Sequence, residues 1–194
     1  TGAGKSLCFQ LPALLSDGTA LVVSPLIALM KNQVDVVRGI SSIDGIAHVL
    51  NSSLNNSEIN VVKNDILNGI TKLLYVAPES LAKQENIDFL NQINISFLAV
   101  DEAHCISEWG HDFRPAYRKI NLLLELLPDI PVLALTASAT SIVVRDIQTQ
   151  LMLKSPKLFQ QSFERPNLSY NIWKTDDKLN AVIQILTHHQ GSSI

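Results

Sequence analysis

Ile95-Ser96-Phe97-Leu98-Ala99-Val100-Asp101-Glu102-Ala103-His104 is the stretch of the sequence that decides the fold. Its first six residues are mainly apolar, which is typical of a buried strand in a parallel sheet. Two adjacent carboxylates, Asp101 and Glu102, come directly after this strand, where ligands bind in open α/β sheets. Nucleotide hydrolases hold magnesium and activate the attacking water at such a place. The stretch therefore predicts an α/β fold with a nucleotide site.

The first residues, Thr1-Gly2-Ala3-Gly4-Lys5-Ser6, match the end of the phosphate-binding pattern GxxxxGK[ST]. Glycines let the backbone curl tightly, so that the N–H groups of Gly2, Ala3, Gly4 and Lys5 can face phosphates at a helix start. Lys5 is expected to reach the β- and γ-phosphates, and Ser6 to bind magnesium. The first glycine of the pattern would precede Thr1, so we expect the strand that feeds this loop to lie outside the sequence.

The acidic pair supplies the second half of a nucleotide site, which argues against a chance match of the partial loop pattern. We assign Asp101 to magnesium, together with Ser6. Glu102 is assigned as the base or positioner of the attacking water, because phosphoryl transfer depends mainly on placement and charge stabilisation. The alternative is that both acids are solvated and cap the next helix.

Length and composition place the chain among ordinary globular proteins. With 194 residues, 46% hydrophobic and 17% charged, it can form one α/β domain, or one domain with a fragment of a second. The net charge of −3 does not indicate nucleic-acid binding, although a local groove could still bind DNA. No apolar run approaches the ~18 residues of a membrane span, and no signal peptide is visible. We expect a cytoplasmic protein without a membrane partner, associated with the nucleoid if bacterial.

The two cysteines, Cys8 and Cys105, are too few for a disulfide framework, and we expect reduced thiols. His104, Cys105 and His111 lie close together in the sequence, but their spacing fits no zinc finger or ribbon. The sequence therefore does not predict a zinc site there.

Short β-branched apolar runs alternate with helical periodicity, which argues for βαβ units and a parallel sheet. Strands are predicted at 19–23, 46–50, 72–76, 95–100, 132–135 and 158–159. Helices are predicted at 5–15, 28–40, 57–68, 87–92, 117–127, 141–151 and 176–188, with a strand or extended linker at 168–173. Polar tips follow four of the strands, at Ser24-Pro25, Ala77-Pro78-Glu79, Asp101-Glu102 and Thr136-Ala137-Ser138. Because parallel strands end at one edge, these tips are expected to converge.

Two further signals concern boundaries. Ser57 with Asn60 resembles a helix start that lacks the full capping box, because Asn replaces Glu or Gln, and Gly69 would close that helix. After residue 167 the chain changes character. We expect a first domain over residues 1–170, and a linker with the beginning of a second domain over 171–194.

These motifs together resemble the RecQ family of superfamily 2 DNA helicases, over nearly the whole chain. The similar segments are Thr1–Pro12 (Walker A), Ser24–Val34 (motif Ia), Leu50–Ser53, Leu73–Glu79, the aromatic-rich loop Cys105–Pro115, Leu135–Thr140 (motif III) and Ser162–Leu168. Ser138 stands where threonine is commoner in the family. The resemblance implies a RecA-like P-loop domain with a mostly parallel sheet flanked by helices, followed by the start of a second RecA-like domain.

The resemblance also implies an activity, which is ATP-dependent, magnesium-dependent 3′-to-5′ DNA unwinding in repair or recombination. Expected partners are single-stranded DNA and duplexes with a 3′ overhang. The resemblance makes His104 a link between the ATP site and the DNA-sensing loop, although a purely structural histidine is the alternative. Because the second motor domain supplies an arginine finger, we expect residues 1–194 alone to be nearly inactive.

Aromatic and basic residues in the 105–115 loop are candidates for sensing single-stranded DNA. They are Trp109, Phe113 and Arg114, since aromatic rings stack on bases and Arg attracts phosphate. The alternative is a packed structural loop. His111 could report to the nucleotide side, and Thr136 with Ser138 could relay the phosphate state to the DNA groove. Ser24, Lys31 and Asn51 are candidates for DNA-backbone contacts.

Two other functions remain open from the sequence. Ser138-Ala139-Thr140 would serve equally as motif III of an RNA helicase, although the Cys105–Pro115 loop argues against it. A nucleotide- or DNA-binding module without catalysis is the third reading.

Overall fold

The computed structural model describes residues 4–160, 167–169 and 171–188. It divides the chain into two compact units, Thr1–Pro156 and Lys157–Ile194. The domain boundary predicted at 170/171 involves residue 170, which lies outside the described residues, so this boundary stays a prediction. None of the helices in the described part of the chain combines the length and apolar character that a membrane span requires.

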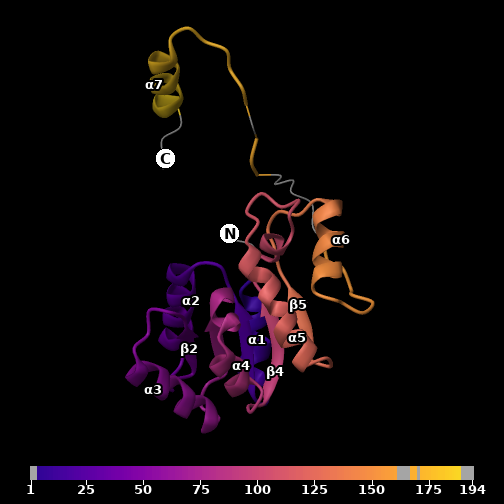
Figure 1. Ribbon diagram of the computed structural model, residues 1–194. Coiled ribbons are helices and arrows are strands. Elements are labelled where there is room, and N and C mark those ends of the chain that lie inside the picture. Colours follow the sequence, from indigo (N-terminus) through magenta and orange to yellow (C-terminus); the bar gives the residue numbers. More distant parts are fainter. Residues whose placement is uncertain (1–3, 161–166, 170, 189–194) are drawn as a thin grey trace. The chain divides into compact units, whose positions relative to one another are not determined.

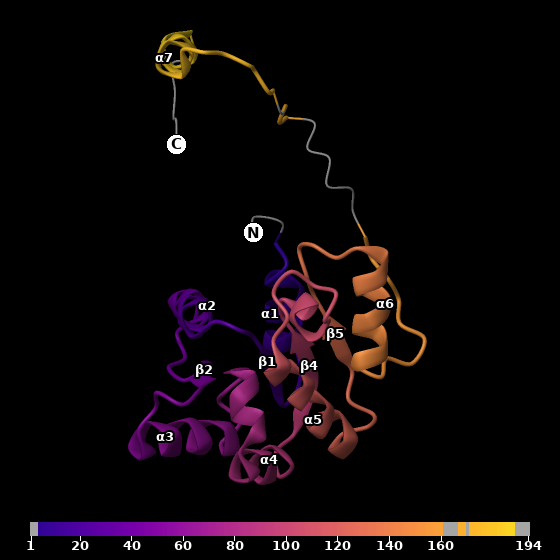
Figure 2. The ribbon, with the colours of Figure 1, turned by 45° about the horizontal axis from the view of Figure 1, so that its top comes forward.

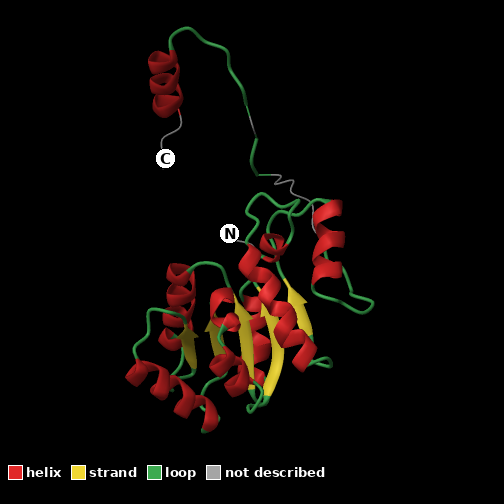
Figure 3. Ribbon diagram, in the orientation of Figure 1, coloured by secondary structure: helices red, strands yellow, loops and turns green. Residues whose placement is uncertain are grey.

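The first unit is built on a five-stranded parallel sheet in the order β2-β3-β1-β4-β5. The strands are β1 (Thr19–Val23), β2 (Ala47–Leu50), β3 (Leu73–Val76), β4 (Ile95–Val100) and β5 (Val132–Ala134). All five arrows in Figure 3 point to the same edge of the sheet. The α/β class and the five strands from 19 to 135 are confirmed. The strand predicted at 158–159 is wrong, because those residues are irregular and Phe159 is 89% exposed.

Helices cover both faces of the sheet (Figure 1). They are α1 (Leu7–Leu15), α2 (Ile27–Gly39), α3 (Asn56–Leu67), α4 (Gln84–Leu90), α5 (Ile120–Leu126) and α6 (Ser141–Gln150), with 3-10 turns η1 (Pro78–Ala82), η2 (Ala103–Ile106) and η3 (Pro115–Lys119). In Figure 2, α2 and α3 lie on opposite sides of β2. The helix predicted over 117–127 is η3 followed by α5, and the others lie within a few residues of their predicted bounds.

The alternation of side chains along each strand creates two cores. Leu21 and Val23 of β1 pack with α3, α4, α5 and α6, whereas Ala20 and Val22 pack with α1 and α2. Burial of an aliphatic side chain contributes about 1.5–3 kcal/mol. A central strand that is buried on both faces therefore fixes the position of the turn at its carboxyl end.

The start of α3 differs from the prediction. Asn55 is the N-cap, its Oδ1 accepts a hydrogen bond from the Glu58 N–H at 3.0 Å, and Glu58 Oε2 accepts one from the Asn55 N–H at 2.8 Å. A complete capping box is therefore present two residues before the predicted start at Ser57 and Asn60. Gly69, with φ of +71°, follows the helix as predicted.

The second unit contains one described helix, α7 (Lys178–His188), close to the predicted 176–188. None of its described residues is buried. The described residues between 167 and 175 form no strand, so the extended-linker alternative for 168–173 holds for them.

Candidate nucleotide and nucleic-acid site

The phosphate loop leads into α1. Gly4 has a left-handed φ of +69°, and its carbonyl accepts a hydrogen bond from the Leu7 N–H at 3.0 Å. Lys5 and Ser6 are half-buried directly before the helix. Gly2 and Ala3 lie outside the described residues. Burial raises the pKa of Asp101 and lowers that of His104, and the positive charge of Lys5 makes a smaller contribution that lowers both pKa values.

Asp101 is the first residue after β4 and is held by three hydrogen bonds. Its N–H donates to the Val23 carbonyl at 2.9 Å, and its carbonyl accepts from the Tyr117 hydroxyl at 2.9 Å. Its Oδ1 accepts from the Glu102 N–H at 3.0 Å. Burial of the carboxylate raises the pKa of Asp101, and the adjacent charge of Glu102 raises it further. Perturbed pKa values of this kind are common at functional sites.

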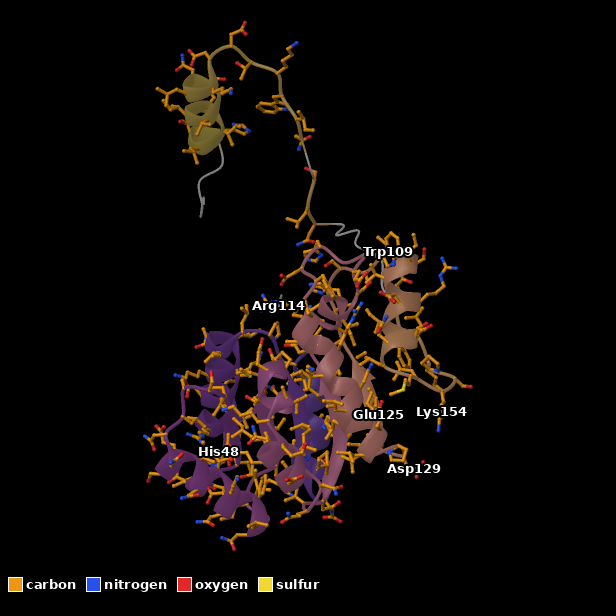
Figure 4. All side chains as sticks on the ribbon, viewed as in Figure 1. His48, Trp109, Arg114, Glu125, Asp129 and Lys154 are labelled. Atoms are coloured by element: carbon orange, nitrogen blue, oxygen red, sulfur yellow. The ribbon has the colours of Figure 1, made fainter. Side chains whose placement is uncertain are left out.

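The raised pKa of Asp101 leads to a stability prediction. The folded state keeps the Asp101 carboxyl proton at pH values above the ordinary aspartate pKa. The free energy of unfolding therefore falls as pH rises from the ordinary pKa to the raised one, and the ionised carboxylate is destabilising at neutral pH. Asp101→Asn removes the charge and keeps an oxygen for the Glu102 N–H. We expect a higher Tm for the metal-free chain at pH 7 in circular dichroism, relative to the exposed control Asp129→Asn (Figure 4). A lower Tm than the control would contradict this account.

Glu102 adopts a left-handed conformation, with φ of +45° and ψ of +47°. Such a conformation costs a non-glycine residue on the order of 1–3 kcal/mol. It is held by the adjacent residue, because the Ala103 N–H donates to the Leu135 carbonyl beyond β5 at 2.8 Å. The turn directs the Glu102 carboxylate to His104, with 3.4 Å between Oε2 and Nδ1.

His104 joins the acidic turn to the turn after β5. Its Nδ1 lies 2.8 Å from Thr136 Oγ1, and the same Thr136 oxygen accepts from the Ser138 N–H at 3.3 Å. His104 is 5% exposed, and this burial lowers its pKa, so the ring is neutral at physiological pH. The structure thus brings together Glu102, His104 and Thr136, which the sequence places 34 residues apart (102 to 136).

The aromatic-rich segment Cys105–Pro115 runs into η3 at Pro115, and its residues 105–114, called the 105–114 loop below, are closed by backbone hydrogen bonds. The Arg114 N–H donates to the Cys105 carbonyl at 2.8 Å, and the Gly110 N–H donates to the Ser107 carbonyl at 3.0 Å. A Cβ on Gly110 would lie 2.5 Å from the His104 carbonyl oxygen, so the loop packs against η2 without room for a side chain. At the loop, Trp109 is 74% exposed and available for stacking (Figure 4).

Arg114 ties this loop to the turn after β1. Its NH1 donates to the Pro25 carbonyl at 3.0 Å, while Nε and NH2 donate to Asp112 Oδ2 at 3.2 and 3.0 Å. The Arg114 hydrogen bonds lower the pKa of Asp112. Phe113 is half-buried, and the Arg118 guanidinium lies 5.2 Å from its ring centroid.

Two other loop residues contact His104. The His111 ring stacks on the His104 ring, with 4.4 Å between centroids. Cys105 Sγ lies 3.8 Å from His104 Nε2 and 3.8 Å from Asp112 Oδ2. Both cysteines are free, and burial raises the pKa of the Cys105 thiol to about 12.

The three candidates for DNA-backbone contacts differ in exposure. Lys31 on α2 is exposed, whereas Ser24 and Asn51 are 1% and 4% exposed. Among the described side chains, Ser24 Oγ and Asn51 Nδ2 are buried without a hydrogen-bond partner. Only Lys31 therefore presents its side chain to solvent in this structure.

Sequence reasoning missed two residues that support this site. The Tyr117 hydroxyl of η3 donates a hydrogen bond to the Asp101 carbonyl, and Asp112 accepts hydrogen bonds from Arg114 within the 105–114 loop. Neither stands out in the sequence, because an isolated buried tyrosine or an exposed aspartate is common. The only available signal was that both lie within or next to the aromatic-rich loop.

A half-buried lysine directly after Gly4, whose charge acts on Asp101 at the carboxyl edge of a parallel sheet, is typical of a P-loop nucleotide-binding domain. The family model of the DEAD/DEAH box helicase matches residues 1–147, so the chain belongs to that family. Within it, the resemblance to RecQ helicases is confirmed by identities of 42–44% over 98–100% of the chain.

The similar curated proteins are much longer than this chain. The ATP-dependent DNA helicase RecQ of Pasteurella multocida is 42% identical over 100% of the chain and 30% of the relative. RecQ of Bacillus subtilis is 44% identical over 98% of the chain and 32% of the relative. A protein of Acanthamoeba polyphaga mimivirus named "Putative ATP-dependent RNA helicase R290" is 42% identical over 100% of the chain and 35% of that protein.

A solved structure supports the fold. The Pyrococcus furiosus Hef helicase domain superimposes with a TM-score of 0.59 at 20% identity, over 78% of this chain and 31% of that chain.

Proposed function

We propose that the chain is the first motor domain of a DNA helicase that couples ATP hydrolysis to 3′-to-5′ movement along single-stranded DNA. Its substrates would be single-stranded DNA and duplexes with a 3′ overhang, in repair or recombination. The observation that carries the proposal is His104, which contacts Glu102, Thr136 and the base of the 105–114 loop. A single buried ring thus connects the hydrolytic carboxylate to the loop that bears Trp109.

The residues present fit a magnesium–ATP complex. Asp101 and Ser6 offer the oxygen ligands that magnesium prefers, and the bound ion would neutralise charge on the phosphates. Lys5 would bind the β- and γ-phosphates, and Glu102 would position the attacking water. The lowered pKa of His104 keeps it neutral, so its Nδ1 proton can be shared between Glu102 and Thr136 without adding a positive charge.

The proposed roles in DNA binding are assigned from the solvent exposure of the side chains. Trp109 would stack on bases, Lys31 would contact the phosphate backbone, and Arg114 with Phe113 would hold the loop in place. Thr136 and Ser138 would relay the state of the nucleotide through the turn after β5.

Trp109→Ala in the full-length helicase tests the DNA-sensing role. Loss of one stacked base costs ~1–3 kcal/mol, so affinity for single-stranded DNA should fall about 5- to 150-fold. DNA stimulation of hydrolysis should be lost, while hydrolysis without DNA is unchanged. The matched control is Trp173→Ala, which removes the chain's other tryptophan, 68% exposed in the second unit. If both variants behave alike, the loop does not sense DNA.

An RNA helicase is the second candidate, favoured by Ser138-Ala139-Thr140 and by the printed name of the mimivirus relative. Hydrolysis by the full-length protein should be stimulated by single-stranded DNA and not by RNA of the same sequence. Stimulation by RNA alone would establish the second candidate instead. Absence of hydrolysis with both would leave a binding module without catalysis.

The polypeptide of residues 1–194 should hydrolyse ATP at least about 10³-fold more slowly than the full-length helicase. A missing arginine finger costs ~10³–10⁵ in rate in related phosphoryl-transfer systems. Phosphate release by both proteins, with and without DNA, measures the difference. Comparable rates would show that one domain suffices.

A further inference from the structure

Three side chains with different metal-binding atoms converge at the base of the 105–114 loop. They are His104, Cys105 and Asp112, and their ligand atoms all lie within 4.8 Å of one another. A nitrogen, a sulfur and an oxygen together suit zinc, whereas magnesium and calcium prefer oxygen alone. This cluster differs from the oxygen site proposed at Asp101 and Ser6.

The distances are close to those of a tetrahedral zinc site. Ligands 2.0–2.3 Å from one zinc ion lie about 3.5 Å from each other. Cys105 Sγ lies 3.8 Å from both His104 Nε2 and Asp112 Oδ2, so a shift of a few tenths of an ångström brings these two pairs to the spacing of zinc ligands. The ligand atoms of His104 and Asp112 lie within 4.8 Å of each other, and a bound cation would draw this third pair together. The hydrogen bond from the Arg114 N–H to the Cys105 carbonyl already holds the two ends of the loop together.

His104 is oriented as a zinc ligand. Its Nδ1 lies 2.8 Å from Thr136 Oγ1 and 3.4 Å from Glu102 Oε2, so a proton on Nδ1 satisfies both oxygens. The lone pair is then on Nε2, which faces the sulfur. A carboxylate behind a ligating histidine is the usual outer contact of zinc sites.

The structure shows how a cation would reach the three ligands and which side chain would compete with it for Asp112. Cys105 and His104 are buried, while the Asp112 side chain is 48% exposed and forms the entrance from solvent. Arg114 binds Asp112 Oδ2, so an entering cation must share that carboxylate with Arg114 or use its other oxygen. The thiol proton that Cys105 donates to Asp112 would be released to solvent.

We infer that His104, Cys105 and Asp112 form a site for a zinc-like divalent cation, with the fourth position open to water. A cation bound there joins η2 to the far side of the 105–114 loop and fixes the loop against His104. The binding site itself does not depend on the proposed function, since the three ligands are defined by their own geometry. Its effect on coupling between ATP and DNA rests on that function.

Titration of the untagged chain with Co²⁺, followed by absorption, tests the site. We expect one equivalent to produce a thiolate-to-cobalt charge-transfer band, and Zn²⁺ to remove the band by displacement. Cys105→Ser should abolish the band. Asp112→Asn should weaken Co²⁺ binding at least about tenfold, because loss of even an outer contact costs 10–100-fold. Cys8→Ser is the matched control, since it removes the only other thiol, and it should leave the band unchanged.

The variants separate the outcomes. Absence of a thiolate band in the unchanged chain overturns the inference, and so does a band that survives Cys105→Ser or disappears in Cys8→Ser. Far-UV circular dichroism checks the fold of each variant. If Cys105→Ser does not fold, the exposed Asp112→Asn variant decides, because unchanged Co²⁺ affinity in that variant overturns the site as described.

Discussion

Glu102→Gln in the full-length helicase should lower DNA-stimulated ATP turnover by about 10²–10⁴-fold and leave ATP binding intact. This is the usual contribution of a general base or of a group that positions a proton transfer. Glutamine keeps the size of the side chain and a hydrogen-bonding oxygen, but it cannot accept a proton from the attacking water. Steady-state phosphate release and equilibrium binding of ATP measure the two parts separately.

The conformation of Glu102 is the reason that the effect should be large. The left-handed turn is held by hydrogen bonds on both sides of Glu102. Its carboxylate therefore has a fixed position, and a neighbouring acidic side chain cannot easily take over its role. Glu125→Gln, on the exposed surface of α5 (Figure 4), makes the same chemical change away from the site. Turnover of Glu102→Gln within tenfold of this control would exclude Glu102 as the base or positioner.

Lys5→Ala in the same protein should reduce turnover by at least about 10²–10³-fold and, unlike Glu102→Gln, should also weaken ATP binding. Removal of one neutral donor from a preorganised anion site costs about that much, and Lys5 contributes a full charge. In the structure this charge acts on Asp101 and His104. ATP affinity and single-turnover hydrolysis measure the two effects.

Lys154→Ala is the control for Lys5→Ala, because Lys154 is exposed and lies away from the carboxyl edge of the sheet (Figure 4). Taken as a pair, Lys5→Ala and Glu102→Gln distinguish loss of phosphate binding from loss of chemistry. Normal hydrolysis by Lys5→Ala would show that the 1–6 segment is not a phosphate loop, whatever the family resemblance implies.

The central strands could be predicted from the sequence because they are largely buried on both faces and are therefore continuous apolar runs. β1 is buried along its whole length and β4 over its last three residues, and the carboxyl ends of both strands carry the predicted polar residues. The 158–159 prediction failed because two apolar residues do not supply a strand long enough to pair, and Phe159 is exposed. The start of α3 was displaced because Asn55, rather than Ser57, supplies the capping oxygen.

The site was predictable only as far as local motifs extend. Lys5, Asp101 and Glu102 stand in recognisable patterns, but the hydrogen bond between His104 and Thr136 depends on the pairing of β4 with β5. The sequence argument against a metal site considered His104, Cys105 and His111. The structure instead brings Asp112 to the sulfur and stacks His111 on His104, and loop closure of this kind has no sequence pattern.

The hydrogen bond from Arg114 to the Pro25 carbonyl affects the spacing of the two DNA contacts proposed for this domain. It joins the loop that carries Trp109 to the turn between β1 and α2, and α2 carries Lys31. The stacking contact proposed for Trp109 and the phosphate contact proposed for Lys31 are therefore linked within the first unit. If both contacts form, the number of nucleotides between them would stay constant through a cycle of ATP hydrolysis, and any change in spacing along the strand would have to arise between this domain and another one.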